Sequence, residues 1–420
     1  MGVVLAVTRL SGPQESTIYY WRVLKFGHRF VYLKSYKVKQ SILIVLPWSP
    51  ELPGGVSVVV RNLAKTWLDE SIPSTILVND WNTINIKEVG CQTFQLRLSV
   101  ISKFIFRNIL KLIITALPIL IRTWSFLRAR KITTVYFHYP SLDALGILIL
   151  KRVNIYRGSV ILCFHGTDVR RPINRIETIL WRFVFASADA VTACSNALAR
   201  EIERNFALAT GQVLTIYNGV DTATFAPSAA ARDAWIGFPI VGKPYIVSVG
   251  SFIERKGHRF LLDAFAHLAP KYPDLYLVII GMDGPERIPL EAMVAQLQLE
   301  NRVLFLIGLP PEQVAYIVAR AMVCVQPSIA EPFGMAVIEA GACGVLVAAS
   351  NVGGHAELIE SGVTGLLFPA SNSHAIACVL EKLFCGWSLQ HAIVLKFREQ
   401  ILVQYTWKAC ADAYIAAGNR

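Results

Sequence analysis

The chain has 420 residues, of which 54% are hydrophobic and 17% charged, and its mean hydropathy is +0.46. This length exceeds one ordinary hydrophobic core, so we expect two domains, and the apolar composition is typical of parallel sheets buried on both faces. The charge is uneven: residues 1–225 hold 27 lysines and arginines against 13 acids, and residues 226–420 hold 14 against 16. Because no zinc-finger spacing or aromatic-basic strand pattern accompanies the basic half, the sequence argues against a nucleic-acid partner.

The eight cysteines are scattered, with no C-x-x-C pair. This usage is typical of small buried residues in a reducing compartment and argues against a disulfide framework. The first 40 residues also lack an apolar segment followed by a small-residue cleavage site, which a secretory signal would have. We therefore expect a cytoplasmic protein, a location that is compatible with peripheral attachment at the inner face of the membrane.

Residues 1–40 form a basic extension with Glu15 as its acid, and we expect this extension to be loosely ordered. A continuous apolar run over 41–47 then predicts a buried strand. It leads into the glycine pair Gly54-Gly55 and a helix expected over 58–68. Strand, glycine pair and helix together are how a Rossmann-like unit admits a phosphate close to the backbone.

Strands and helices continue to alternate, with strands expected over 75–78, 133–138 and 159–164. The last of these strands ends at His165. Because open α/β sheets bind ligands at the carboxyl ends of their strands, we expect His165 at the binding crevice. The alternative is an ordinary loop histidine. Asp168 suits a helix cap or a loop anchor.

The segment 101–131 is both apolar and basic. Eight basic residues and no acid lie between positions 89 and 142. Its apolar run over 109–121 is too short to span a bilayer of about 30 Å, and Pro118 predicts a kink or an end there. Apolar stripes flanked by lysine and arginine suit an interfacial helix, so the sequence is compatible with an anionic membrane surface. The alternative is a helix packed on the sheet with its basic ends in solvent.

A stretch rich in alanine, proline and glycine over 226–242 reads as a linker between domains. The second domain then begins with a strand at 245–249 and a loop that holds Lys256. A later buried strand at 323–327 runs into a loop with Glu331 and a helix that carries Glu339. This spacing lets both carboxylates face one ligand, and the N–H groups at 334–336 favour an anion. The alternative is an ordinary strand-loop-helix with solvated glutamates.

These residues resemble the E-x7-E signature of the retaining GT-B glycosyltransferases of family four (glycosyl transferases group 1). The agreement continues through 352–358 and 362–368. The resemblance covers about 41–420 and implies an α/β protein of two Rossmann-like domains facing across a cleft. An acceptor domain is expected at 41–225, and a nucleotide-sugar donor domain at 243–399. The terminal helix at 400–420 is expected to pack back on the first domain.

The resemblance also implies roles for the candidate residues. Glu339 is expected to bind the ribose diol, Glu331 to lie by the transferred sugar, and His165 to lie beside that sugar. The expected contacts to the diphosphate are Gly54, Gly55, Lys256, Gly334, Met335 and Ala336, and Phe333 is a further expected contact to the nucleotide-sugar donor. With no D-x-D in the sequence, neither a metal nor another cofactor is expected. One departure is Ser251, which stands where the family usually has an arginine. The neighbouring charge, Arg255, either turns into the site or lies in solvent.

The expected reaction is transfer of a hexosyl group from a nucleoside diphosphate sugar to a glycan or lipid-linked acceptor, with retention of configuration, in polysaccharide or glycolipid biosynthesis. Two alternatives share the fold. One is a non-catalytic sugar- or lipid-binding protein, which Ser251 and the unusual N-terminus favour. The other is a nucleotide-sugar epimerase or a sugar phosphorylase, although the lysine context of a pyridoxal-dependent phosphorylase is absent.

Overall fold

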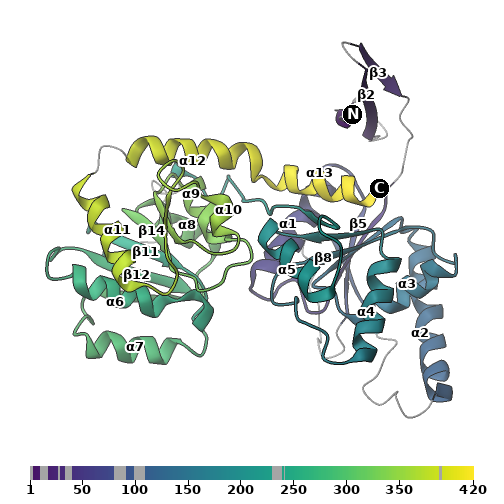
Figure 1. The fold of residues 1–420 in the computed structure, drawn as a ribbon, viewed down its shortest axis with the longest axis horizontal. Helices are drawn as coiled ribbons and strands as arrows, with labels where there is room; N and C mark the ends of the chain where they lie inside the picture. The colour runs from purple at the N-terminus through teal and green to yellow at the C-terminus, as the bar shows by residue number, and fades with distance from the viewer. Residues whose placement is uncertain are drawn as a thin grey trace.

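A computed structural model describes residues 3–9, 18–26, 29–33, 40–79, 91–98, 109–228, 239–240, 242–386 and 390–420. Two lobes lie side by side, each built on a parallel sheet, and the terminal helices run across both (Figure 1). The arrangement is the GT-B architecture that the sequence predicts.

A small antiparallel sheet precedes the first lobe. It consists of β1 (Val3–Arg9), β2 (Ile18–Phe26) and β3 (Arg29–Leu33). Figure 1 shows it standing apart from both larger sheets. This differs from the loosely ordered extension expected for residues 1–40. The strands pair as two successive hairpins, with Arg9 opposite Ile18 and Phe26 opposite Arg29, whereas the sequence-based expectation rested on the basic charge of the segment.

The described part of the first domain holds a parallel sheet in the order β10-β9-β8-β7-β4-β5-β6. Its strands are β4 (Ile42–Leu46), β5 (Ser74–Val78), β6 (Gln92–Gln95), β7 (Thr134–His138), β8 (Ser159–Phe164), β9 (Ala190–Ala193) and β10 (Val213–Thr215). The helices are α1 (Gly55–Asp69), α2 (Ile109–Ala129), α3 (Leu145–Arg152), α4 (Arg175–Ser187) and α5 (Asn196–Phe206). Every residue of β4 and β7 is buried, as continuous apolar runs in a doubly covered sheet require.

The second domain has a parallel sheet in the order β13-β12-β11-β14-β15-β16 among its described residues. Its strands are β11 (Tyr245–Val249), β12 (Tyr276–Gly281), β13 (Val303–Ile307), β14 (Val323–Gln326), β15 (Val347–Ser350) and β16 (Leu366–Phe368). The helices are α6 (His258–Leu268), α7 (Arg287–Gln296), α8 (Pro311–Ala319), α9 (Met335–Ala342), α10 (His355–Leu358) and α11 (Ser373–Cys385).

Both sheets have a reversal of strand order at their centre, and this reversal is where a ligand crevice is expected. In each, the chain starts at a central strand, builds outward on one side and then crosses to the other. This order reverses between β4 and β7 in the first domain and between β11 and β14 in the second. A crevice opens outside the carboxyl ends of the strands at such a reversal. The glycine loop after β4 and the loops after β11 and β14 are therefore placed to face one ligand.

The terminal chain links the two domains. Where one helix is expected, the structure has α12 (Gln390–Gln404) and α13 (Trp407–Gly418). Phe397 and Ile401 of α12 lie so close to Gly341 of α9 that an added Cβ there would clash with both side chains. In α13, the carbonyl of Tyr414 accepts a hydrogen bond from the hydroxyl of Tyr136 in β7 at 2.8 Å. Along the chain, α12 thus packs on the second domain and α13 then packs on the first domain.

The basic segment forms α2, and the helix continues through Pro118 rather than ending there. Positions 101–108 lie outside the described residues. Leu117 and Ile121 are exposed, so this face of α2 is not covered by the sheet. Across the described residues, no helix combines the length and the apolarity that crossing a bilayer requires.

Tyr414 tests the role of the terminal helix. Its ring is buried and meets the ring of Tyr136 edge-on, with 5.6 Å between the centroids. Replacing Tyr414 with alanine leaves a cavity between α13 and the first sheet, which should lower the free energy of unfolding by about 3 kcal/mol in denaturant titrations. Leu402→Ala, at an exposed position of α12, is the matched control and should change little. Equal stability of the two variants would contradict this packing role.

Candidate active site

A cavity of about 310 Å³, the central cavity, opens between the domains at both reversals of strand order. Its first-domain lining comes from the start of α1, the loop after β8 and the end of β9. The second-domain lining comes from the loop after β11, the loop after β14 and the first turns of α9. The predicted residues that line it are Gly55, His165, Arg255, Lys256, Glu331, Phe333, Gly334, Met335, Ala336 and Glu339.

Gly54 lies one residue outside the lining, at the N-terminal cap of α1. Its φ of 144° falls in the region that favours glycine. It therefore shapes the turn that delivers Gly55 to the cavity. Asp168 lies in the loop below, where its carboxylate accepts hydrogen bonds from the backbone N–H groups of His165 and Gly166. This is the loop-anchor role.

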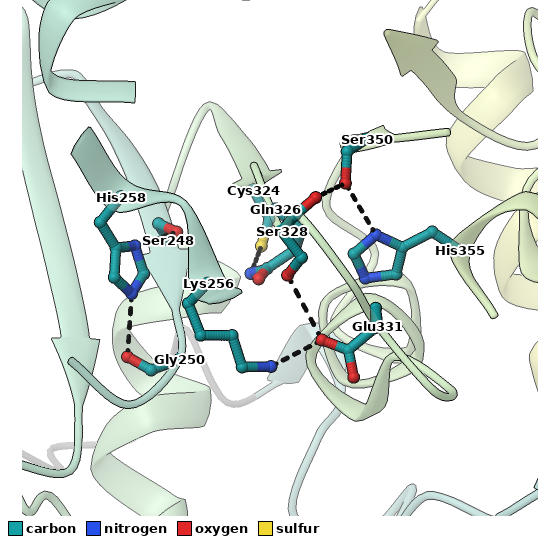
Figure 2. Close-up of polar contacts among 10 residues, drawn as sticks. All are labelled: Ser248, Gly250, Lys256, His258, Cys324, Gln326, Ser328, Glu331, Ser350 and His355. Atoms are coloured by element: carbon teal, nitrogen blue, oxygen red, sulfur yellow. Dashed lines mark hydrogen bonds and ion pairs between the residues drawn. The ribbon is translucent and has the colours of Figure 1, made fainter. Parts of the chain in front are cut away.

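Lys256 and Glu331, which both line the central cavity, form an ion pair. The ammonium of Lys256 lies 2.6 Å from Oε2 of Glu331, and both side chains are largely buried (Figure 2). The hydroxyl of Ser328 donates to the same oxygen at 3.3 Å. Burial by itself would raise the pKa of Glu331, but Lys256, with smaller contributions from His355 and Arg255, outweighs it and lowers the pKa to about 2. Glu331 is therefore a fixed carboxylate at any physiological pH.

The second glutamate has the opposite electrostatics. Glu339 sits in the second turn of α9, and its carboxylate takes no hydrogen bond from the described part of the chain. Burial raises the pKa of Glu339 to about 7, against which Lys256 acts only partly. A carboxylate held in this way lacks hydrogen-bond donors, so a ligand that brings hydroxyl groups would supply them.

Two glycines hold the Glu331 loop against α10. Side chains at Gly353 and Gly354 would collide with the carbonyls of Glu331 and Phe333, so these positions allow the close approach of two backbones. Gly354 N–H also donates to the carbonyl of Glu331 at 2.9 Å. Gly334, with a φ of 114°, starts α9 directly beside the ring of His355. The N–H groups of α9 are left facing the cavity, where they favour an anion.

His165 pairs with a second histidine that the sequence analysis did not select. Its Nε2 lies 2.9 Å from Nδ1 of His138, and the rings are stacked with 5.1 Å between centroids. Burial lowers the pKa of His165 to about 4. Burial and then His165 lower the pKa of His138 well below its ordinary value. Both rings are therefore neutral at pH 7. His138 ends strand β7, so the strand-end rule that selected His165 applies to it as well.

Glu357 of α10 connects the two domains. Its carboxylate accepts hydrogen bonds from the backbone N–H of Asn196 at 2.9 Å and of Ala197 at 2.5 Å, at the start of α5. Tyr217 adds a hydroxyl at 3.2 Å. A carboxylate at a helix N-terminus meets both unpaired N–H groups and the positive end of the helix dipole. Glu357 belongs to the stretch 352–358 that agrees with the family signature, yet only the fold reveals its partner.

A second cavity of about 420 Å³, the outer cavity, adjoins the central one. The two share Thr167, Arg255, Glu331 and Pro332 in their linings. Residues of α5, including Glu201 and Arg204, form its first-domain wall. Arg255 therefore turns into the site rather than lying only in solvent, and Glu331 stands where the two cavities meet.

Comparison with known proteins decides the family. The description "Glycosyl transferases group 1" fits residues 235–399, and "Glycosyltransferase Family 4" fits residues 53–224. The chain is a group 1 glycosyltransferase. These two matches cover both domains and include the predicted site residues from Gly54 to Glu339.

Curated relatives are similar over part of their length. A phosphatidylinositol N-acetylglucosaminyltransferase subunit of Arabidopsis thaliana is 26% identical over 61% of this chain and 55% of its own. The human protein of the same name is 35% identical over 35% of this chain and 28% of its own. The matches thus span about half, or less, of these relatives. A GDP-mannose-dependent mannosyltransferase of Mycolicibacterium smegmatis is 27% identical over 66% of this glycosyltransferase and 74% of its own chain.

Solved structures confirm the GT-B fold. Sucrose-phosphate synthase from Thermosynechococcus elongatus superposes with a TM-score of 0.70 at 23% identity, covering 90% of this chain and 98% of the other. The Anabaena protein HepE in complex with UDP and glucose gives a TM-score of 0.68 at 18% identity, covering 90% and 98%. At such identities the likeness concerns the fold.

Glu339 yields a stability prediction. Its pKa of about 7 in the folded state exceeds its ordinary value of 4.5, so the folded state binds the proton more tightly and stability falls as pH rises between these values. The cost at pH 8 is at most about 3 kcal/mol. Glu339→Gln should therefore raise the thermal midpoint of the ligand-free protein at pH 8 and change it little at pH 5.

The matched control for this prediction is Glu300→Gln, at an exposed position outside the site. It should leave the midpoint unchanged at both pH values. A midpoint for Glu339→Gln that equals the control's at pH 8 would show that Glu339 is not held at a cost in the folded protein.

Proposed function

We propose that this glycosyltransferase moves a hexosyl group from a nucleoside diphosphate sugar to an acceptor hydroxyl, with retention of anomeric configuration. The observation that carries the proposal is the grouping of Lys256, Glu331 and Glu339 with the N-terminus of α9 around one cavity. The N–H groups and Lys256 suit a diphosphate. Glu339, without a donor of its own, suits the ribose diol. Glu331 suits the hydroxyl groups of the sugar.

In this reaction the bond between the anomeric carbon and the diphosphate oxygen breaks, and its electron pair stays on the diphosphate. The acceptor oxygen forms the new bond to the same carbon and gives its proton to the leaving phosphate. Charge therefore grows on the diphosphate oxygens, where preorganised N–H groups and cations stabilise the transition state. Lys256, Arg255 and the start of α9 line the cavity in which we propose that the diphosphate binds.

Retention is proposed to proceed on one face of the sugar. A carboxylate nucleophile would need to be free to attack the anomeric carbon. Lys256 and Ser328 both donate to Oε2 of Glu331, and this ion pair lowers the nucleophilicity of the carboxylate. We therefore assign Glu331 to positioning and electrostatic support. Neutral His165, oriented by His138, suits a hydrogen bond to a sugar hydroxyl.

The outer cavity suits the acceptor, because it meets the central cavity at Glu331. A glycan or a lipid-linked headgroup is the acceptor class that we propose, in polysaccharide or glycolipid biosynthesis. Uridine is a reasonable first donor base, since the structurally similar HepE was solved in complex with UDP and glucose. A non-catalytic binding protein would be stabilised by a nucleotide sugar, but it would not release nucleoside diphosphate in the presence of an acceptor.

Donor binding tests the division of roles between the two glutamates. One of a panel of UDP-, GDP- and ADP-sugars should raise the thermal midpoint of the wild type, since a ligand at 100 times its Kd adds about 2.7 kcal/mol. Glu339→Gln should weaken this nucleotide binding by about 1–3 kcal/mol, because a charged hydrogen-bond pair is lost. Glu331→Gln should keep the nucleotide affinity and lower turnover.

Glu300→Gln again serves as the control, with wild-type affinity and turnover expected. An equal loss of free-nucleotide affinity in both active-site variants would refute the separate roles. A panel in which no nucleotide sugar stabilises the wild type would refute the proposed function itself.

Metal independence is a separate prediction, since the ammonium of Lys256 rather than a metal ion is proposed to meet the diphosphate. Product formation should be unchanged in excess EDTA. Lys256→Ala should lower kcat by about 10²–10³, because a preorganised charge on the leaving group is lost. Lys271→Ala, at an exposed lysine of the same domain, should behave as wild type. Loss of activity in EDTA, restored by Mn²⁺ or Mg²⁺, would reject this prediction.

A further inference from the structure

The outer face of α4 is unusually apolar for a solvent-exposed helix. Ile173, just before the helix, is 80% exposed, and Ile176 and Ile179 are 47% and 63% exposed. Single exposed isoleucines are common on protein surfaces, but three within seven residues form a patch that needs a function. Within α4, Ile176 and Ile179 share a sector of roughly 120° with Arg175 and Arg182. We call Ile173, Ile176, Ile179, Arg175 and Arg182 the α4 patch.

The loop that displays Ile173 is fixed by hydrogen bonds. The side chain of Asn174 caps α4 by accepting from the N–H of Glu177 at 2.9 Å. In return, the carboxylate of Glu177 accepts from the N–H of Ile173 at 2.7 Å. This reciprocal pair resembles a capping box and satisfies the N–H groups at the helix start. Ile173 is therefore held outward by its backbone, so its exposure is built into the fold.

The charge around the patch has one sign. Arg170, Arg171, Arg175 and Arg182 are all exposed. The acid in this stretch, Glu177, is buried and pairs with Arg170 at 2.7 Å. Among the described residues, neither Arg175 nor Arg182 has an ion pair or a ring contact. An apolar strip bordered by unpaired arginines complements a surface that is apolar inside and anionic outside.

We propose that the α4 patch docks the enzyme on an anionic lipid bilayer. Isoleucines that enter the boundary between headgroups and acyl chains, with arginines at the level of the phosphates, match the chemistry of an interfacial helix. A protein partner of the same fit would need an apolar groove edged with acids. A second copy of the chain would have to supply such a groove, and the oligomeric state of the α4 variants tests for it.

The position of the patch connects it to the site. Nε of Arg171 donates to the side chain of Asn205 at 3.2 Å, so the loop before α4 is tied to the end of α5. The preceding residue, Arg204, and Glu201 line the outer cavity. The loop before α4 is thus tied to the helix that lines the outer cavity, which is where we propose that the acceptor binds. This step rests on the proposed function, whereas the docking itself does not.

The sequence predicts a possible lipid contact on the basic segment that includes α2, and the α4 patch is a second, separate surface. Arg128 of α2 lies over the ring of Trp124, with 5.1 Å from its guanidinium carbon to the ring centroid. Arg130 lies over Phe94 and Phe126 in the same way. These guanidinium groups are engaged by the protein's own aromatic rings. α2 is also separated from α4 by α3, which contacts both helices.

The test is sedimentation of the full chain with vesicles, measured without donor or acceptor. The vesicles are phosphatidylcholine alone, or phosphatidylcholine with one third phosphatidylglycerol. Wild type should bind the anionic vesicles at low salt and be released at high salt. Arg175→Gln/Arg182→Gln and Ile176→Ser/Ile179→Ser should each lower the partition coefficient at least about tenfold. The matched control, Arg122→Gln/Arg128→Gln on α2, should bind as wild type.

Each other outcome decides against the α4 patch. Wild type that fails to bind anionic vesicles, α4 variants that bind as wild type, or a loss confined to the α2 control would overturn the proposal. So would α4 variants that change the oligomeric state in sedimentation velocity, because the face would then join two copies. All substitutions are at exposed positions, and equal thermal midpoints check that the variants are folded.

Donor experiments keep this proposal separate from the proposed function. Vesicle binding without stabilisation by any nucleotide sugar would uphold the docking surface and refute the transferase. Stabilisation by a nucleotide sugar without vesicle binding would refute the docking surface and leave the proposed function standing. With both present, the α4 variants should retain wild-type affinity for the nucleotide sugar, since no residue of the α4 patch lines the central cavity.

Discussion

The site depends on the contact between Glu357 and the start of α5. The two domains have separate sheets, and a cavity lined by both exists only while they are held at one distance. Glu357 fixes that distance by accepting hydrogen bonds from two backbone N–H groups of the other domain. Close packing between Gly166 and Pro332 adds a steric limit on the same side of the cleft. The hydrogen bonds of Glu357 and the packing of the Gly166 backbone against the Pro332 ring together set the width of the cavity.

Within that cavity, one lysine separates the behaviour of two glutamates. Both carboxylates are buried, and burial disfavours their charge to begin with. Lys256 contacts Glu331 directly and keeps it ionised, but it acts on Glu339 only from a distance. The two carboxylates therefore line one cavity but differ in pKa, which is lowered for Glu331 and raised for Glu339. A ligand with a diol would supply the hydrogen-bond donors that Glu339 lacks, so its binding would offset the cost of burying this carboxylate.

Much of the site was predictable because its parts are local. Glu331, Glu339 and Lys256 each follow or flank a buried apolar run, and strand ends converge at a reversal of sheet order. Glycines 54, 334 and 353 mark backbone turns that few other residues permit. Contacts between distant segments were not predictable in this way. His138 stands at a strand end, as His165 does, but its pairing with a histidine 27 positions later is visible only in the fold, and Glu357 needed a helix start about 160 positions earlier. The strands before residue 40 were missed for a different reason: they pair as local hairpins, but the expectation for this segment rested on its basic charge.

Arg255 shows how a departure from the family pattern is accommodated. Ser251 follows Gly250, whose carbonyl lies so close to Gly281 that an added Cβ at Gly281 would collide with it. Four residues after Ser251, the carbonyl of Arg255 accepts a hydrogen bond from the N–H of Ile329 at 2.7 Å, which ties its backbone to the Glu331 loop. The guanidinium consequently borders both cavities and contributes to the low pKa of Glu331. Positive charge is thus retained at the site, but at the boundary between the cavities, where it can act on groups in either one.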